Sequence, residues 1–145
     1  MNDIEPRIRP FVDALNATGL VRTFSSCEGH FEPHEQTLVN RNHAEVRFVP
    51  AGGVSVEQVE TTVGQWLATY KKKHGLVPVR VIGYKLFTPA DDEIDVTFVI
   101  ELHPFNRFDP PARKRTDTDR AVAQIVTVLN LFVSSHDDDS RTSYS

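Results

Sequence analysis

Residues 79–102 have the sequence VRVIGYKLF-TPADDE-IDVTFVIEL, in which two alternating runs lie on either side of a turn-forming segment. Alternation of apolar and polar side chains with period 2 is typical of a half-buried β-strand, and the Pro and Asp residues between the runs favour a turn. The pattern therefore predicts an antiparallel hairpin with strands over 79–87 and 94–102. For the second strand we expect either burial on both faces near Val99, or a single inward set made of Ile94, Val96, Phe98, Ile100 and Leu102.

Helical patterns lie on both sides of this hairpin. Upstream, Ser55 and Gln58 form a capping box, in which each side chain satisfies a free backbone N–H of the other residue. Downstream, Thr116 and Asp119 predict a second capping box at the start of a helix over 116–133. The apolar stripe of the upstream helix is expected to be Val56, Val59, Val63, Trp66, Leu67 and Tyr70.

The N-terminal part of the chain has the same order of patterns. A helix from Arg9 or Pro10 to Thr18 is expected, because proline suits the first turn of a helix and Gly19 can supply a left-handed cap after the last turn. A strand over 20–25 and an alternating strand over 44–48 follow this helix.

The complete order of elements is therefore α-β-β-α-β-β-α. Strands that occur in adjacent pairs predict the α+β class, with a mostly antiparallel four-stranded sheet and helices on one face. We expect a single two-layer domain over residues 1–135, with a long polar loop over 103–115. The polar composition of residues 136–145 predicts a disordered tail.

Composition and charge are those of an ordinary globular domain. The chain has 145 residues, 39% of them hydrophobic, and a net charge of −4, which excludes a surface that is basic throughout. Its single cysteine cannot form an intramolecular disulfide, and no apolar run approaches the ~20 residues of a membrane span. We therefore expect a cytoplasmic protein with no membrane partner.

A chemically dense motif, FSSCEGH at residues 24–30, follows the first predicted strand. Hydroxyls, together with backbone N–H groups that converge at a glycine turn, can bind a phosphate or a carboxylate. Cys27 acts as a nucleophile only as a thiolate, and His30 could stabilise that thiolate or act as general base; alternatively, Cys27 is a small buried apolar residue at a strand end. The predicted catalytic residues are Cys27 and His30, and the predicted ligand-binding residues are Thr23, Ser25, Ser26, Glu28 and Gly29.

A metal ion is the second interpretation of the same region. Cys27, His30, His34 and His43 are all potential ligands of a first-row ion, and the Cys-x2-His spacing resembles half of a zinc site. No second pair of ligands follows at a familiar spacing, so no residue is assigned as a metal ligand and zinc is the less favoured cofactor. His103 lies at the end of the last predicted strand and could reach the motif through the sheet.

The predicted loop before the last helix is basic and aromatic. This composition is found in segments that contact RNA, but a solvated loop whose phenylalanines pack against the edge of the core is the favoured interpretation, because the spacing fits no known module. The residues concerned are Phe105, Arg107, Phe108, Arg113, Lys114 and Arg115.

The motif Ser25-Ser26-Cys27-Glu28-Gly29-His30 resembles the signature Ser-Ser-Cys-x-Gly-Arg of the wybutosine-synthesis tRNA methyltransferase family. The likeness covers residues 10–30, with Leu15-Asn16 on a helix and Thr23 on a strand, and His30 stands where the family has arginine. The resemblance implies S-adenosylmethionine as cofactor and RNA or a nucleotide-like molecule as substrate, with Ser25, Ser26 and Cys27 shaping the pocket.

These observations leave three hypotheses for function. The first is a small enzyme that acts on RNA or a nucleotide-like substrate at the motif, with a methyltransferase-like activity. The second is a thiol- or metal-dependent hydrolase that uses Cys27 and His30. The third is a non-catalytic module that binds an anionic ligand or a protein partner at the same place.

Overall fold

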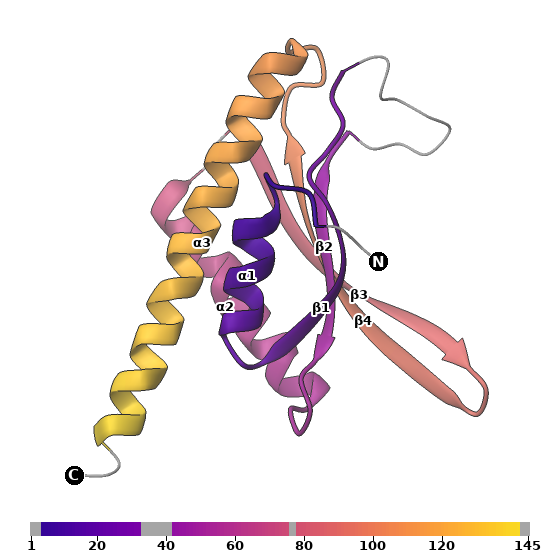
Figure 1. Cartoon of the computed structure of the whole chain (residues 1–145), viewed down its shortest axis with the longest axis vertical. Coiled ribbons are helices and arrows are strands. Elements are labelled where there is room, and N and C mark those ends of the chain that lie inside the picture. Colours follow the sequence, from indigo (N-terminus) through magenta and orange to yellow (C-terminus); the bar gives the residue numbers. More distant parts are fainter. Residues whose placement is uncertain (1–3, 33–41, 76–77, 143–145) are drawn as a thin grey trace.

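The structure is a computed structural model that describes residues 4–32, 42–75 and 78–142, with only the helical backbone described for residues 134–142. The predicted α+β class and the predicted order of elements are confirmed. All three helices lie on one side of an antiparallel four-stranded sheet (Figure 1). The elements are α1 (Arg9–Ala17), β1 (Val21–Cys27), β2 (Ala44–Pro50), α2 (Val56–His74), β3 (Val79–Ala90), β4 (Glu93–Pro104) and α3 (Pro111–Thr142).

The strand order in the sheet is β1-β2-β4-β3, so β2 and β4 are the central strands. Val46 pairs with Ile100 and Phe48 with Phe98, and these four side chains are buried beneath the helices. Residues directly opposite each other on an antiparallel pair share a face of the sheet. This register therefore brings the alternating apolar residues of both strands into one core.

The hairpin of β3 and β4 is longer than predicted. Its strands continue to Ala90 and from Glu93, so the turn consists only of Asp91 and Asp92. Of the two expected arrangements of β4, burial on both faces near Val99 is the one found, since Val99 is buried together with its neighbours Phe98 and Ile100. A single inward set is wrong at Ile94, which is exposed because the tip of the hairpin projects beyond the helices (Figure 1).

The first two helices match their predicted patterns. Ser55 Oγ accepts a hydrogen bond from the Gln58 N–H, and Gln58 Oε1 accepts one from the Ser55 N–H, so the capping box of α2 is confirmed. Trp66, in the middle of the predicted stripe, is fully buried. Gly19 follows α1 with a φ of +75°, as expected of a left-handed residue after a helix.

Helix α3 differs from its prediction at both ends. It begins at Pro111 rather than Thr116, and the Thr116 hydroxyl donates to the Ala112 carbonyl inside the helix at 3.0 Å, so the predicted capping box of Thr116 is wrong. A proline is favourable in the first turn, where its missing N–H has no intrahelical partner in any case. The loop predicted over 103–115 is correspondingly shorter, because β4 extends to Pro104.

At its C-terminal end, α3 continues to Thr142 and includes residues for which the sequence predicts a disordered polar tail. The chain has no glycine or proline from Ala112 to Thr142, so no strong helix breaker interrupts this segment. Among the described residues, none of the helices combines the length and apolar content required to cross a membrane.

Candidate functional site

The first half of the motif lies in strand β1 rather than in a loop. Ser25, Ser26 and Cys27 are the last three residues of β1, and a bulge interrupts its pairing with β2 between Thr23 and Ser25. Ser26 lies opposite the buried Val46, whereas its neighbour Ser25 lies opposite Arg47, the next residue of β2. Since successive side chains of a strand point to opposite faces, the two serine hydroxyls do not line one pocket.

Thr23 belongs to the packing of α1 against β1. Asn16 Nδ2 donates to Thr23 Oγ1 at 2.9 Å, and the Thr23 N–H donates to Asn16 Oδ1 at 3.0 Å. This reciprocal pair satisfies a backbone group beside the bulge. Thr23, predicted as a ligand-binding residue, therefore connects β1 to α1 in the structure.

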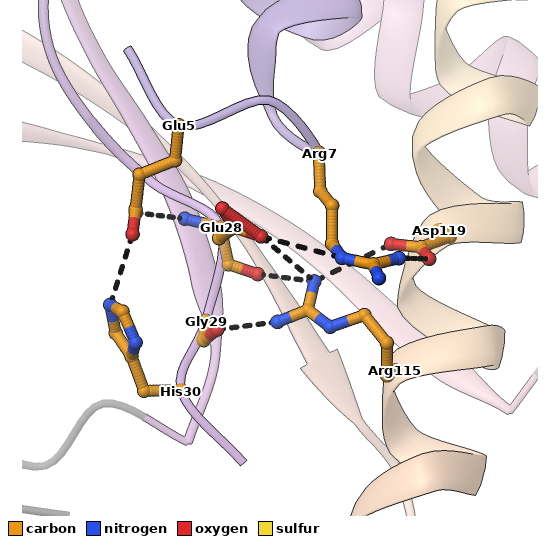
Figure 2. A network of polar contacts seen from close by, with 7 residues as sticks. All are labelled: Glu5, Arg7, Glu28, Gly29, His30, Arg115 and Asp119. Atoms are coloured by element: carbon orange, nitrogen blue, oxygen red, sulfur yellow. Dashed lines mark hydrogen bonds and ion pairs between the residues drawn. The ribbon is translucent and has the colours of Figure 1, made fainter. Parts of the chain in front are cut away.

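The second half of the motif is organised around Glu5, which no sequence pattern singled out. The Glu28 N–H donates to Glu5 Oε1 at 2.9 Å, and Glu5 Oε2 lies 3.4 Å from His30 Nε2 (Figure 2). Between them, Gly29 has a φ of +89°, and a Cβ at this position would lie 2.8 Å from the Phe31 ring. Only glycine fits here without strain, as the turn in the motif predicts.

Arg115 of α3 holds this turn from the other side. Its guanidinium donates to the Glu28 carbonyl at 2.9 Å and to the Gly29 carbonyl (Figure 2). The same group lies 4.7 Å from the centre of the Phe31 ring. Arg7 completes the network by pairing with Asp119 and with Glu28, the latter at 3.6 Å. Both cations are therefore already bound to protein groups, which makes RNA contact through Arg115, the less favoured interpretation of the basic segment, harder to support.

The structure brings Cys27 and His30 together with Glu5. One ligand atom from each residue, namely the Cys27 sulfur, a His30 ring nitrogen and a Glu5 carboxylate oxygen, lies within 4.8 Å of the other two. All three side chains are partly buried. Glu5 and His30 also line a cleft of about 290 Å³, together with Arg7, Glu28, Phe31 and Arg115.

A second cluster, formed by His43, Glu101 and His103, lies on the sheet. His103 Nε2 is 2.7 Å from Glu101 Oε1, His43 Nε2 is 3.8 Å from Glu101 Oε2, and the two imidazole rings stack at 4.5 Å. The sequence pointed to both histidines but paired them neither with each other nor with Glu101. The missing signal was the register, because Glu45 lies opposite Glu101 and thereby brings the start of β2 to the end of β4. His34, the remaining histidine of the metal hypothesis, lies outside the described residues.

The electrostatics of the sheet cluster favour ionised carboxylates. Hydrogen bonds with His43, the larger effect, and with Arg47 lower the pKa of Glu45 to about 2. The hydrogen bond between His43 and Glu45 also raises the pKa of His43. Burial opposes ionisation of Glu101, but hydrogen bonds from Tyr84 and His103 outweigh it and lower the pKa of this carboxyl. Burial, then the hydrogen bond to Glu101, raises the pKa of Tyr84 to about 12.

The carboxyl of Glu28 behaves in the opposite way. Burial raises its pKa, the nearby negative charge of Glu5 raises it further, and the cations Arg115 and Arg7 only partly offset the two effects. The site therefore combines the Glu5 carboxylate, which accepts an N–H bond, with the Glu28 carboxyl, whose ionisation is disfavoured.

No protein-family model, curated protein or solved structure matches this chain. The resemblance to the wybutosine-synthesis methyltransferases therefore stays a prediction from residues 10–30.

Proposed function

We propose that this protein is a metal-dependent hydrolase whose ion is held by Glu5, Cys27 and His30. The observation that carries the proposal is the convergence of their ligand atoms within 4.8 Å. Zinc binds thiolate, imidazole and carboxylate at about 2.0–2.3 Å, so atoms that share one ion lie roughly 3–4 Å apart. Small side-chain adjustments would bring the three groups from their present separation onto an ion.

The number of potential ligands within residues 4–32, 42–75 and 78–133 is that of a catalytic rather than a structural ion. Structural zinc sites are closed by four protein ligands, whereas catalytic sites have three and leave a position for water or substrate. Among the residues that the structure describes, three potential ligands stand together, and two of them, Glu5 and His30, line the cleft. A bound ion of this class lowers the pKa of its water to about 7 and so supplies a hydroxide for hydrolysis.

The same convergence argues against a thiol nucleophile. In a Cys-His-carboxylate triad, the thiol and the carboxylate bind opposite nitrogens of the imidazole through two hydrogen bonds of roughly 3 Å each. The imidazole then separates the thiol from the carboxylate. In this protein the Cys27 sulfur and the Glu5 oxygen lie within 4.8 Å of each other, which is a better fit to a shared ion than to a proton relay.

The surroundings of the three residues support a fixed site. The Glu28 N–H donates to Glu5 Oε1, which leaves Glu5 Oε2 directed at His30. Hydrogen bonds of this kind orient metal-binding carboxylates and contribute to affinity. Arg115 in turn holds the backbone that carries both the N–H and the imidazole.

The test is Co²⁺ substitution of the purified full-length chain, read by absorption spectroscopy and by hydrolysis of activated carboxylic and phosphoric esters. We expect a thiolate-to-cobalt charge-transfer band that is lost in Cys27→Ser, together with hydrolysis that metal removal abolishes and Zn²⁺ restores. His30→Ala should lose both signals, and His74→Ala, which alters a histidine on α2, should keep them.

Two results would contradict the proposal. One is hydrolysis by metal-free protein that Cys27→Ser abolishes, which would identify a thiol enzyme. The other is the absence of any charge-transfer band combined with stabilisation by S-adenosylmethionine that Ser26→Ala removes, which would favour the methyltransferase-like prediction.

A further inference from the structure

We propose that His43, Glu101 and His103 bind a second divalent first-row metal ion, at a site distinct from Glu5, Cys27 and His30. Their ligand atoms also lie within 4.8 Å of one another. Two imidazoles and a carboxylate form the donor set of many zinc enzymes and of the iron(II) sites with two histidines and one carboxylate. The proposal does not depend on the proposed hydrolase activity, because the two sites share no ligand.

The distances fit one shared ion. His103 Nε2 lies 2.7 Å from one oxygen of Glu101, and His43 Nε2 lies 3.8 Å from the other. Ligands at about 2.0–2.2 Å from one ion are separated from each other by roughly 3–3.5 Å. The observed separations fall on both sides of this range, so an ion requires only small rotations of the two rings.

The sheet fixes the positions from which the three side chains extend. Glu101 and His103 are two residues apart on β4 and therefore point to the same face. His43 immediately precedes β2, whose first residue, Ala44, lies opposite Leu102. The central strand β4 thus holds two of the ligands, and the residue directly before β2 supplies the third. Sites on such rigid elements need little rearrangement to bind.

The cluster is enclosed but reachable. The side chains of His43, Glu101 and His103 are 17%, 12% and 28% exposed, so an ion could enter without unfolding of the sheet. The Tyr84 hydroxyl donates to Glu101, and Glu45 lies 3.0 Å from His43 Nε2. Tyr84 therefore orients the carboxylate, as partners of metal ligands commonly do.

The experiment is a Co²⁺ titration of the full-length Cys27→Ser variant, which removes the thiolate of the first site. We expect visible d–d absorption that saturates and shows no thiolate charge-transfer band. Adding His103→Ala should weaken this binding by more than the roughly 100-fold that loss of an orienting partner can cost. Adding Glu101→Gln, which preserves the shape of the side chain but removes its charge, should also weaken it, whereas adding His74→Ala should leave it unchanged.

Two outcomes would overturn the inference. One is a Cys27→Ser protein that shows no saturable Co²⁺ binding. The other is Co²⁺ binding that survives both His103→Ala and Glu101→Gln. Either would mean that the three residues form only a polar network of histidines and carboxylates. Circular dichroism of each variant separates loss of binding from loss of fold, and His103→Gln replaces His103→Ala if the latter does not fold. Failure of the first site would appear separately, as the missing thiolate band of the otherwise unaltered chain.

Discussion

At the scale of single residues, the motif loop is held by a side chain from the other end of the sequence. Arg115 binds two successive carbonyls, those of Glu28 and Gly29, and covers the Phe31 ring. Its side chain is only 19% exposed, so this cation serves the fold of the motif. The composition around it left RNA contact open as the less favoured interpretation, because composition does not reveal which cations are already paired.

Replacing Arg115 therefore tests the turn. Arg115→Ala should lower the free energy of unfolding by about 1.5–3 kcal/mol, the range for hydrogen bonds to charged groups. It should also weaken Co²⁺ binding at the thiolate site, because the turn carries His30. Urea unfolding and the charge-transfer band measure the two effects. Arg107→Ala, on an exposed residue whose guanidinium stacks on the exposed Phe108, is the matched control; equal losses in both variants would show that Arg115 has no special role.

Gly29 provides a second test at this scale. Gly29→Ala places a Cβ 2.8 Å from the Phe31 ring at a φ of +89°, which should cost about 1–3 kcal/mol of stability in urea unfolding. Gly52→Ala is the control, since a Cβ added at Gly52 would have nothing within 4 Å and the φ of this residue is not positive. A Gly29→Ala protein as stable as Gly52→Ala would contradict the described turn.

At the scale of elements, helix α3 shows how context selects among start signals. The sequence contains two candidate capping boxes, and only the one at Ser55 begins a helix. At Thr116 the helix is already in its second turn, because Pro111 starts it. A capping motif satisfies free N–H groups, so it has no such groups to satisfy once an earlier residue has begun the helix.

A pair of substitutions distinguishes the two boxes. Ser55→Ala should cost about 1 kcal/mol, as expected for loss of an N-cap. Thr116→Ala should change the free energy of unfolding by less than about 0.5 kcal/mol, because it replaces an exposed residue inside a helix with a better helix former. Thermal and urea unfolding of both variants provide the measurement. If Thr116→Ala lowered the free energy of unfolding by about 1 kcal/mol, Thr116 would be the N-cap of the helix after all.

At the scale of the whole molecule, the two proposed metal sites lie at the same end of the sheet. Cys27 is opposite Glu45 on β2, and Glu45 is opposite Glu101 on β4. Since neighbouring strands lie about 4.8 Å apart, the Cα atoms of Cys27 and Glu101 are separated by roughly 10 Å. The two groups of ligands share no residue, so the sites should bind independently.

Independence predicts additive stabilisation. Each ion that binds only the folded chain adds about 2.7 kcal/mol at a free concentration 100 times its dissociation constant. Zn²⁺ should therefore raise the melting temperature of the unaltered chain, and chelation should reverse the rise. Cys27→Ser and His103→Ala should each lose part of this shift, and the double variant should lose nearly all of it. A shift retained in the double variant would show that Zn²⁺ stabilises the chain elsewhere.

The sequence by itself determined the local architecture. Period-2 alternation defined the hairpin strands, the Ser55–Gln58 box defined the start of α2, and the spacing of strands in pairs indicated an antiparallel α+β fold. These features depend on interactions between residues near in sequence, which a pattern can record. The motif at 24–30 was found for the same reason, and its turn glycine has the positive φ that its position implied.

Only the tertiary structure decided which residues share a site. Glu5 reaches His30, Arg115 reaches the motif from α3, and His43 meets Glu101 and His103, all across long stretches of chain. Strand register brings His43 to Glu101 and His103, and helix packing brings Arg115 to the motif. Both depend on the free energy of burying one common core, with contributions from every element at once, so no local pattern in the sequence specifies them.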